Sequence, residues 1–302
     1  MRTPFDSSGK PAARAARELG IPLTIRSVGE DYVELLRNPH FGYGKGANPC
    51  LDCHIYMTRM ARQLMEERNA WVVVSGEVLG QRPMSQKRQD LDLVCRRSGL
   101  EGRLLRPLSA RWLEPTIPEQ EGLINRERLY SFTGRKRNGL IALAAELGIS
   151  HIPAPSPGCA LTETTFAPRL RDLLQTNPKA TLWDCGLLRI GRHYRVSPLH
   201  KVVLGRNAEE NDRIRSLWTR ETVVQNALIE PESFVGPHAI LCGPATEEVI
   251  RLTGSLMVSY TRQVPPNRQE VLVRVHHGQM RQVIQIDASD AAQVRQMCHL
   301  IR

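Results

Sequence analysis

The sequence predicts an α/β protein, with an incomplete parallel-sheet domain at residues 1–165 and a smaller α+β domain at residues 166–302. Helix-like and strand-like segments alternate over residues 12–37, as in parallel sheets with crossover helices. Residues 70–75 form the near-continuous β-branched run that is typical of a buried parallel strand. From Phe166 onward the pattern changes to hairpin-like strands and helices, which indicates a separate second domain.

The composition is that of an ordinary globular protein. The chain has 302 residues, enough for two cores, with 41% hydrophobic and 24% charged residues. No apolar run approaches the roughly 20 residues that a membrane span needs. The N-terminus has no apolar h-region, so we expect no secretory signal. We therefore expect a cytoplasmic protein without a membrane partner.

Charge and cysteine content narrow the function classes. The formal net charge is +10 and the isoelectric point is near 9.6. This balance favours a polyanionic partner, most simply nucleic acid, although many basic proteins bind none. Seven cysteines, an odd number, argue against a disulfide framework and leave metal or redox chemistry open.

The first domain is expected to begin with short elements. In chain order they are a helix at 12–19, a strand at 22–28, a helix at 31–37, a helix at 54–68, the strand at 70–75, a helix at 89–97, a strand at 103–108, helices at 126–132 and 140–147, and a strand at 149–152. Helical spacing of apolar residues and glycine stops predict the helices.

The second domain is expected to mix both element types. In order we predict a helix at 170–174, strands at 186–197 and 201–204, a helix at 208–218, a strand at 239–242, a helix at 246–252, a strand at 256–261, a hairpin of 270–276 with 281–286, and a helix at 288–300. Period-two alternation around His277 and Gly278 predicts the hairpin.

Two cysteines three positions apart, Cys50 and Cys53, precede the helix expected at 54–68. A helix N-terminus favours the thiolate, which is the nucleophilic and metal-binding form. A third thiol, Cys159, lies in a Pro-Gly loop after a predicted strand. The alternative is that these cysteines are buried without function.

Three chemistries suit Cys50, Cys53 and Cys159. A structural zinc would need a fourth ligand such as His54. An iron–sulfur cluster held by three thiolates would leave one iron open to a substrate. In redox sulfur transfer, one thiolate carries a persulfide and another releases its sulfur by forming a disulfide. The spacing disfavours zinc but does not choose between the other two.

The strand at 70–75 ends in Gly76 and Glu77, and a loop with Gln81 and Arg82 follows. Ligands of open α/β sheets bind outside the carboxyl ends of the strands, so these four residues are candidate cofactor ligands. An ordinary strand-to-loop turn would look the same.

A compact basic loop, Arg135, Lys136 and Arg137, is a candidate nucleic-acid contact. Its charges suit phosphate groups and offer no sequence readout. The alternative is a solvated helix start.

Taken together, four stretches resemble one known family. They are 48–53 (Asn-Pro-Cys-Leu-Asp-Cys), 75–86 from Ser75 to Gln86, 103–110 from Arg103 to Ala110, and 157–162 (Pro-Gly-Cys-Ala-Leu-Thr). They resemble the tRNA thiouridylase-like proteins of the PP-loop ATP pyrophosphatase, or adenine nucleotide alpha hydrolase, superfamily. The resemblance covers about residues 10 to 175. It implies an adenine nucleotide alpha hydrolase-like first domain.

The resemblance also implies an activity. ATP, with Mg, would adenylate a uridine of tRNA, and sulfur from a donor protein or sulfide would displace AMP. Cys50, Cys53 and Cys159 match the family's cysteine positions, as persulfide carriers or as ligands of a [4Fe–4S] cluster, and Gly76 matches a nucleotide-contacting position. The family's Ser-Gly-Gly-x-Asp-Ser phosphate loop is absent, which we interpret as a misplaced chain start.

Two other functions stay open. The protein is alternatively a non-catalytic, basic RNA-binding protein that has lost ATP chemistry. It is alternatively a metal or redox sensor that uses the same cysteines without RNA.

Overall fold

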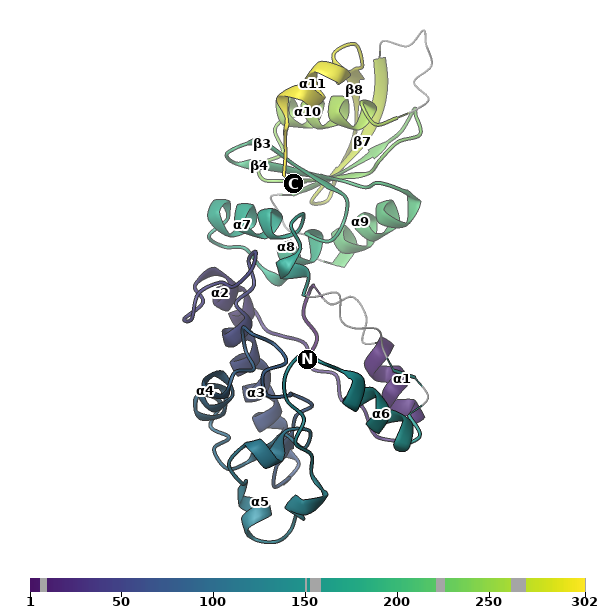
Figure 1. Ribbon diagram of the computed structural model, residues 1–302. Coiled ribbons are helices and arrows are strands. Elements are labelled where there is room, and N and C mark those ends of the chain that lie inside the picture. Colours follow the sequence, from purple (N-terminus) through teal and green to yellow (C-terminus); the bar gives the residue numbers. More distant parts are fainter. Residues whose placement is uncertain (6–9, 150, 153–158, 221–225, 262–269, 302) are drawn as a thin grey trace. The chain divides into compact units, whose positions relative to one another are not determined.

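The computed structural model describes residues 1–5, 10–149, 151–152, 159–220, 226–261 and 270–301. Its contacts divide the chain into two compact units, Met1–Cys159 and Ala160–Arg302 (Figure 1). We call them the first and the second unit and describe each by itself.

The first unit is mostly helices and loops. Its elements are α1 (Lys10–Glu18), α2 (Asp31–Arg37), α3 (Cys50–Glu67), β1 (Val73–Val74), α4 (Arg88–Ser98), β2 (Leu104–Leu105), η1 (Ala110–Trp112), α5 (Ile117–Gln120), η2 (Arg126–Arg128) and α6 (Asn138–Glu146). Strands β1 and β2 pair in parallel, with Val73 opposite Leu104. Buried Met65, Leu100 and Leu104 form a small core against Val73.

The expected parallel-sheet fold is wrong. The parallel sheet has two strands of two residues each, whereas the large sheet is antiparallel and lies in the second unit. The segment expected as a strand at 22–28 forms one isolated bridge, Arg2 with Ser27. Leu23 and Ile25 are 43% and 54% exposed, so this segment lacks the two covered faces that a parallel strand requires.

The second unit is built on a seven-stranded sheet. Its elements are η3 (Ala160–Thr162), α7 (Ala167–Thr176), α8 (Leu182–Leu187), β3 (Arg192–Ser197), β4 (His200–Leu204), α9 (Ala208–Arg220), β5 (Ala227–Pro231), β6 (Ala239–Cys242), α10 (Glu247–Val258), β7 (Glu270–His277), β8 (Met280–Asp287), α11 (Ala291–Met297) and β9 (His299–Leu300). The strand order is β8-β7-β5-β6-β4-β3-β9, and every pairing is antiparallel.

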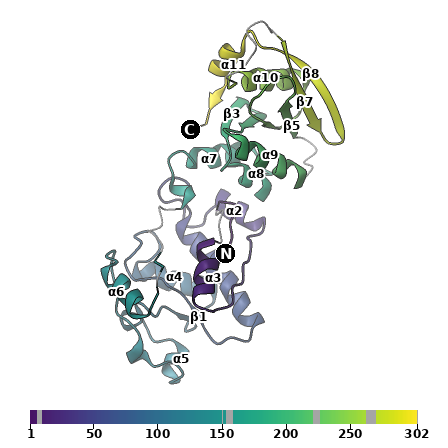
Figure 2. The ribbon, with the colours of Figure 1, turned by 90° about the vertical axis from the view of Figure 1, so that its right-hand side faces the viewer.

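Both faces of this sheet are covered around β4 and β6. Alternate residues such as Val202 and Leu241 belong to one core, together with Leu256 and Met257 of α10. Their neighbours face the other way, where Ile240 packs with Trp183 of α8 and with Ile214 of α9. Figure 1 shows the sheet between α10 and α11 on one side and α7, α8 and α9 on the other. In Figure 2 the β7–β8 hairpin forms the outer edge of the sheet.

One glycine shapes the entry into the sheet. Gly191 precedes β3 with φ +70°, a conformation that other residues rarely adopt. A Cβ at this position would lie 2.1 Å from the carbonyl oxygen of Leu204. The approach of the two backbones at the start of the β3–β4 pair therefore requires glycine.

Candidate functional site

Cys50 and Cys53 lie in the first turn of α3, where Cys50 is the first helical residue. Both thiols are half-buried. The 18-residue helix directs its N-terminal partial positive charge at this turn, which favours a thiolate there.

A polar relay surrounds Cys50. His54 lies one helical turn further along α3, and its Nδ1 is 2.9 Å from Oε1 of Glu77. The other oxygen of Glu77 accepts a hydrogen bond of 2.9 Å from Nε of Arg106, whose side chain is 5% exposed. Oγ of Ser85 is 3.4 Å from Nε2 of His54. The glutamate therefore orients the imidazole and keeps it charged beside the thiol.

The relay shifts three pKa values, and each shift favours the charged form of its group. Burial raises the pKa of Cys50. Hydrogen bonds from His54 and Ser85 and the charges of His54 and Arg82 lower it by more than burial raises it, so the net shift is downward. Burial opposes a charged His54, yet its bonds to Cys50 and Glu77 raise its pKa to about 9. Burial likewise opposes a charged Glu77, but His54 and Arg106 lower its pKa to about 2.

Cys53 has the opposite character. Burial, followed by the charges of Cys159, Cys50 and Asp52, outweighs a hydrogen bond with Tyr32 and raises its pKa to about 11. Its Sγ is 3.4 Å from the hydroxyl oxygen of Tyr32. The pair therefore combines one thiol that is more acidic than usual with one that is less acidic than usual.

Cys159 is exposed and is the last residue of the first unit. The Pro-Gly part of its predicted loop lies outside the described residues. Its charge acts on Cys53, which associates the three predicted cysteines in one region of the first unit. Among the residues that the structure describes, no group of three or more histidine, cysteine or acidic side chains is arranged to hold a metal ion. Zinc and iron–sulfur ligation by these cysteines stay predictions.

The other predicted ligands follow β1. Glu77 faces His54 and Arg106, and Arg82 is exposed close enough for its charge to act on Cys50. A Cβ added at Gly76 would have nothing within 4 Å, and Gln81 is half-buried. A role of these residues in binding ATP or another cofactor stays a prediction.

The predicted basic loop lies directly before α6. Arg135 and Lys136 are exposed, and Arg137 is half-buried. The loop is in the first unit, and its contact with nucleic acid stays a prediction.

Sequence reasoning missed the relay as a unit. From the sequence, His54 is expected only as a possible fourth zinc ligand, and Arg106 is included only within a predicted strand and the family-like stretch 103–110. The spacing of Cys50 and His54, four residues apart on one helix, is the signal that could have paired them. Glu77 and Arg106 join from distant segments, so no local pattern identifies them.

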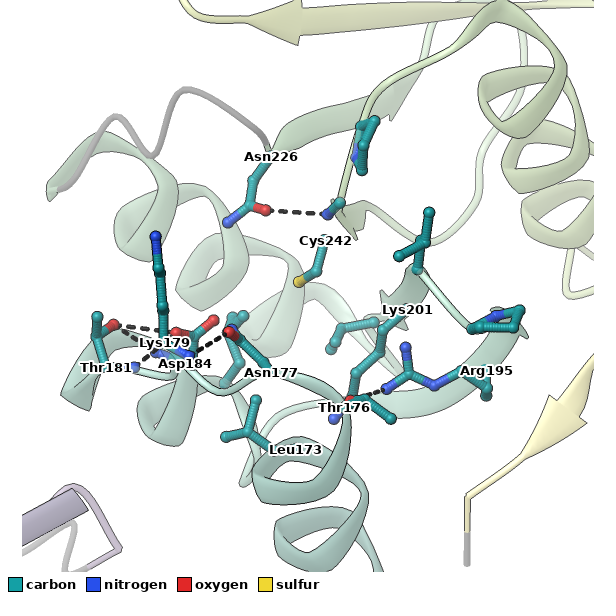
Figure 3. A pocket seen from close by; sticks show the side chains of 16 residues that line it. Leu173, Thr176, Asn177, Lys179, Thr181, Asp184, Arg195, Lys201, Asn226 and Cys242 are labelled. Atoms are coloured by element: carbon teal, nitrogen blue, oxygen red, sulfur yellow. Dashed lines mark hydrogen bonds between the residues drawn. The ribbon is translucent and has the colours of Figure 1, made fainter. Parts of the chain in front are cut away.

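The second unit holds a polar cluster that sequence reasoning also missed. Asp172 of α7 accepts hydrogen bonds of 3.0 and 2.7 Å from Arg195 of β3. Nζ of Lys201, on β4, lies 3.3 Å from the same carboxylate. These residues line or adjoin a cavity of about 450 Å³ (Figure 3).

The comparisons with known proteins concern the second unit above all. Residues 191–297, from the start of β3 to the end of α11, match the model of the NFACT protein RNA binding domain. A search of the curated proteins finds no match. The C-terminal part of the fibronectin/fibrinogen-binding protein of Streptococcus suis is a similar solved structure at 10% identity and a TM-score of 0.29, over 88% of this chain and 99% of that chain.

The resemblance to PP-loop tRNA thiouridylases is therefore wrong. The matching family model is that of an RNA-binding domain, and it covers residues 191–297, which lie beyond the residues 10 to 175 of the resemblance. The sheet that a PP-loop enzyme requires is also missing from the described residues. The same findings leave uridine adenylation, ATP use and sulfur transfer without support. None of the described helices has the length and apolar composition needed to cross a bilayer.

Proposed function

We propose that the protein binds RNA and that its second unit carries the RNA-binding surface. The match of residues 191–297 to an RNA-binding domain model is the observation that carries this proposal. The matched segment contains β3 to β8 and three helices, and so nearly the whole sheet of this unit.

The charge of the chain supports the proposal. The sequence of the second unit has 18 lysines and arginines against 14 aspartates and glutamates, and the first unit has 23 against 17. Both units are thus basic. A basic surface attracts the phosphate backbone, and salt weakens that attraction by restoring counterions.

Fluorescence anisotropy with labelled RNA tests the proposal. We expect the full chain to bind a tRNA and a single-stranded RNA of equal length, with an affinity that falls linearly with salt on a double-logarithmic plot. Comparing the two RNAs shows whether tRNA is the preferred class. Absence of binding to both at about 50 mM salt would contradict RNA binding.

The relay around Cys50 favours a second function, thiol redox exchange. The Cys50 thiolate would attack a disulfide of a small thiol compound, forming a mixed disulfide and releasing one thiolate. Cys53, after losing its proton, would attack the Cys50 sulfur, forming the Cys50–Cys53 disulfide and releasing the second thiol. The substrate disulfide is thereby reduced by two electrons and the protein dithiol is oxidised.

Oxidised glutathione tests this exchange by mass spectrometry. The wild-type protein should form the internal disulfide, whereas Cys53→Ser should retain one glutathione on Cys50. Cys50→Ser should react slowly at Cys53 because burial keeps that thiol protonated. Equal reaction of Cys50 and Cys53 in the two single variants would contradict the assigned roles.

A further inference from the structure

The cavity in the second unit has one cationic wall. It lies between the C-terminal part of α7, the start of α8 and strands β3, β4 and β6 (Figure 3). Arg195 and Lys201 reach across it from the sheet, and Arg195 also donates a hydrogen bond of 2.9 Å to Thr176. Lys179 lines the cavity from the loop after α7 and is exposed.

Lys201 carries unused hydrogen-bonding capacity. Its side chain is 7% exposed, and its Nζ makes no hydrogen bond of good geometry among the described residues, although it lies 3.3 Å from Asp172. Asp172 already accepts two hydrogen bonds from Arg195. Half-buried Arg195, buried Lys201 and exposed Lys179 supply three positive charges at the cavity. Asp172 and Asp184 supply two carboxylates, so positive charge is in excess among these side chains, and Lys201 keeps unsatisfied N–H donors.

The rest of the lining offers polar and apolar groups. Oδ1 of Asn226 accepts a hydrogen bond of 3.2 Å from the backbone of Gly243, which leaves its amide nitrogen as a donor on the wall. Asp184 contributes a carboxylate that also caps α8. Leu173 and Leu199 supply apolar surface. A volume of about 450 Å³ is in the range of sites for one small ligand.

We infer that this cavity receives one unstacked nucleotide of a bound RNA strand, with its phosphate at Arg195 and Lys201 and its base against Asn226 and the apolar side chains of the lining. The inference rests on the proposed RNA binding. A purely structural ion pair would not need a second cation or an open cavity beside it. Protein recognition of RNA commonly uses unstacked bases of single strands.

The experiment compares two charge reversals in the full chain by anisotropy with a single-stranded RNA. Lys179→Glu reverses a charge at the cavity, and Arg281→Glu reverses an exposed charge on β8, at the opposite edge of the sheet. Both change the net charge equally. We expect Lys179→Glu to weaken binding about tenfold more than Arg281→Glu.

Lys201→Met adds a test inside the cavity and should weaken RNA binding about tenfold. Lys201→Met also removes an ion pair with Asp172, so its thermal unfolding is compared with that of the wild type. If Lys201→Met does not fold, the comparison of Lys179→Glu with Arg281→Glu alone tests the cavity. Titration with 5′-UMP distinguishes a free mononucleotide from a nucleotide within RNA. Tight binding of 5′-UMP without RNA binding would contradict the inference that the nucleotide in the cavity belongs to an RNA strand.

The outcomes separate the two proposals. If wild-type protein binds RNA and Lys179→Glu behaves like Arg281→Glu, the cavity inference is overturned and RNA binding stands. If wild-type protein binds neither RNA nor 5′-UMP, both proposals are overturned. A selective loss in Lys179→Glu supports both.

Discussion

Different interactions stabilise the interior of each unit. The second unit is stabilised by strand pairing and by apolar packing on both faces of its sheet, where the buried residues form two cores. In the first unit, polar side chains tie loops together: Arg126 donates to the carbonyl oxygens of Ala110 and Leu113 and pairs with Glu119. A sheet depends on register and backbone conformation, whereas such a network depends on individual charges.

The difference extends to the candidate sites. The thiol site combines a charged imidazole, a carboxylate and a guanidinium in a closed relay, so the charges of the protein satisfy one another. At the cavity of the second unit, the ammonium group of Lys201 lies 3.3 Å from a carboxylate but makes no hydrogen bond to the described residues. The first arrangement is suited to changing the reactivity of Cys50, and the second is suited to binding an anion.

Gly191→Ala should have the largest effect, because it forces a Cβ against the backbone of Leu204 at a positive φ. We expect a loss of at least about 3 kcal/mol in the free energy of unfolding of the second unit. Hydrogen exchange measured by mass spectrometry should show faster exchange in β3 and β4 and unchanged exchange in α3.

Gly186→Ala is the matched control. Gly186 lies within α8, and an added Cβ would meet nothing within 4 Å, so this change should leave stability unchanged or raise it slightly. Equal exchange in the two variants would contradict the role of Gly191.

Half-buried His54 and buried His193 should affect stability with opposite dependence on pH. The raised pKa of His54 means that its stabilisation is complete below pH 6.5 and is lost as the pH rises through about 9. It amounts to on the order of 3 kcal/mol. Burial, followed by the charges of Lys201 and Arg169, holds the pKa of His193 well below 6.5. Acidification below pH 6.5 therefore destabilises the second unit through His193.

Histidine NMR titration tests this contrast. The ring signals of His54 should titrate near pH 9, and those of His193 should not titrate before the unit unfolds. His54→Gln and His193→Gln assign the signals. Titration of both rings near pH 6.5 would contradict the assigned environments.

Glu77→Gln should lower the reactivity of Cys50 by about tenfold at pH 7, since the neutral amide no longer supports a charged His54. Iodoacetamide alkylation followed by peptide mapping measures Cys50 and Cys53 separately. Glu114→Gln changes an exposed glutamate of the same unit and should leave both rates unchanged. A rate of Cys50 that is unaffected by Glu77→Gln would argue against the relay.

The smallest effect is expected in the basic loop. If RNA reaches the first unit, Arg135→Gln combined with Lys136→Gln should weaken RNA binding about threefold and reduce the salt slope by up to about two phosphate contacts. Anisotropy at several salt concentrations measures both. An unchanged salt slope would show that the loop does not contact RNA.

The sequence predicted local elements better than their arrangement. The hairpin expected at 270–276 and 281–286 is confirmed as β7 and β8, because period-two alternation specifies a strand locally. The strand expected at 256–261 is wrong, since α10 continues to Val258 and buries Leu256 and Met257 through helical spacing. Strand order and antiparallel pairing depend on distant partners that no local pattern reveals.

The same limit applies to the candidate sites. Cys50 and Cys53 stand out because their spacing is local. The partners that set their acidities, Glu77 and Arg106, come from other segments. In the second unit, α7 brings Asp172 to Arg195 and Lys201 although no motif connects these residues.

Ultraviolet crosslinking of a bound RNA to the full chain, with peptide mapping by mass spectrometry, tests the central claim most directly. We expect crosslinked peptides within residues 191–297 and in the adjoining residues that line the cavity, such as Lys179. Crosslinks confined to Met1–Cys159 would place RNA binding in the first unit and contradict the account.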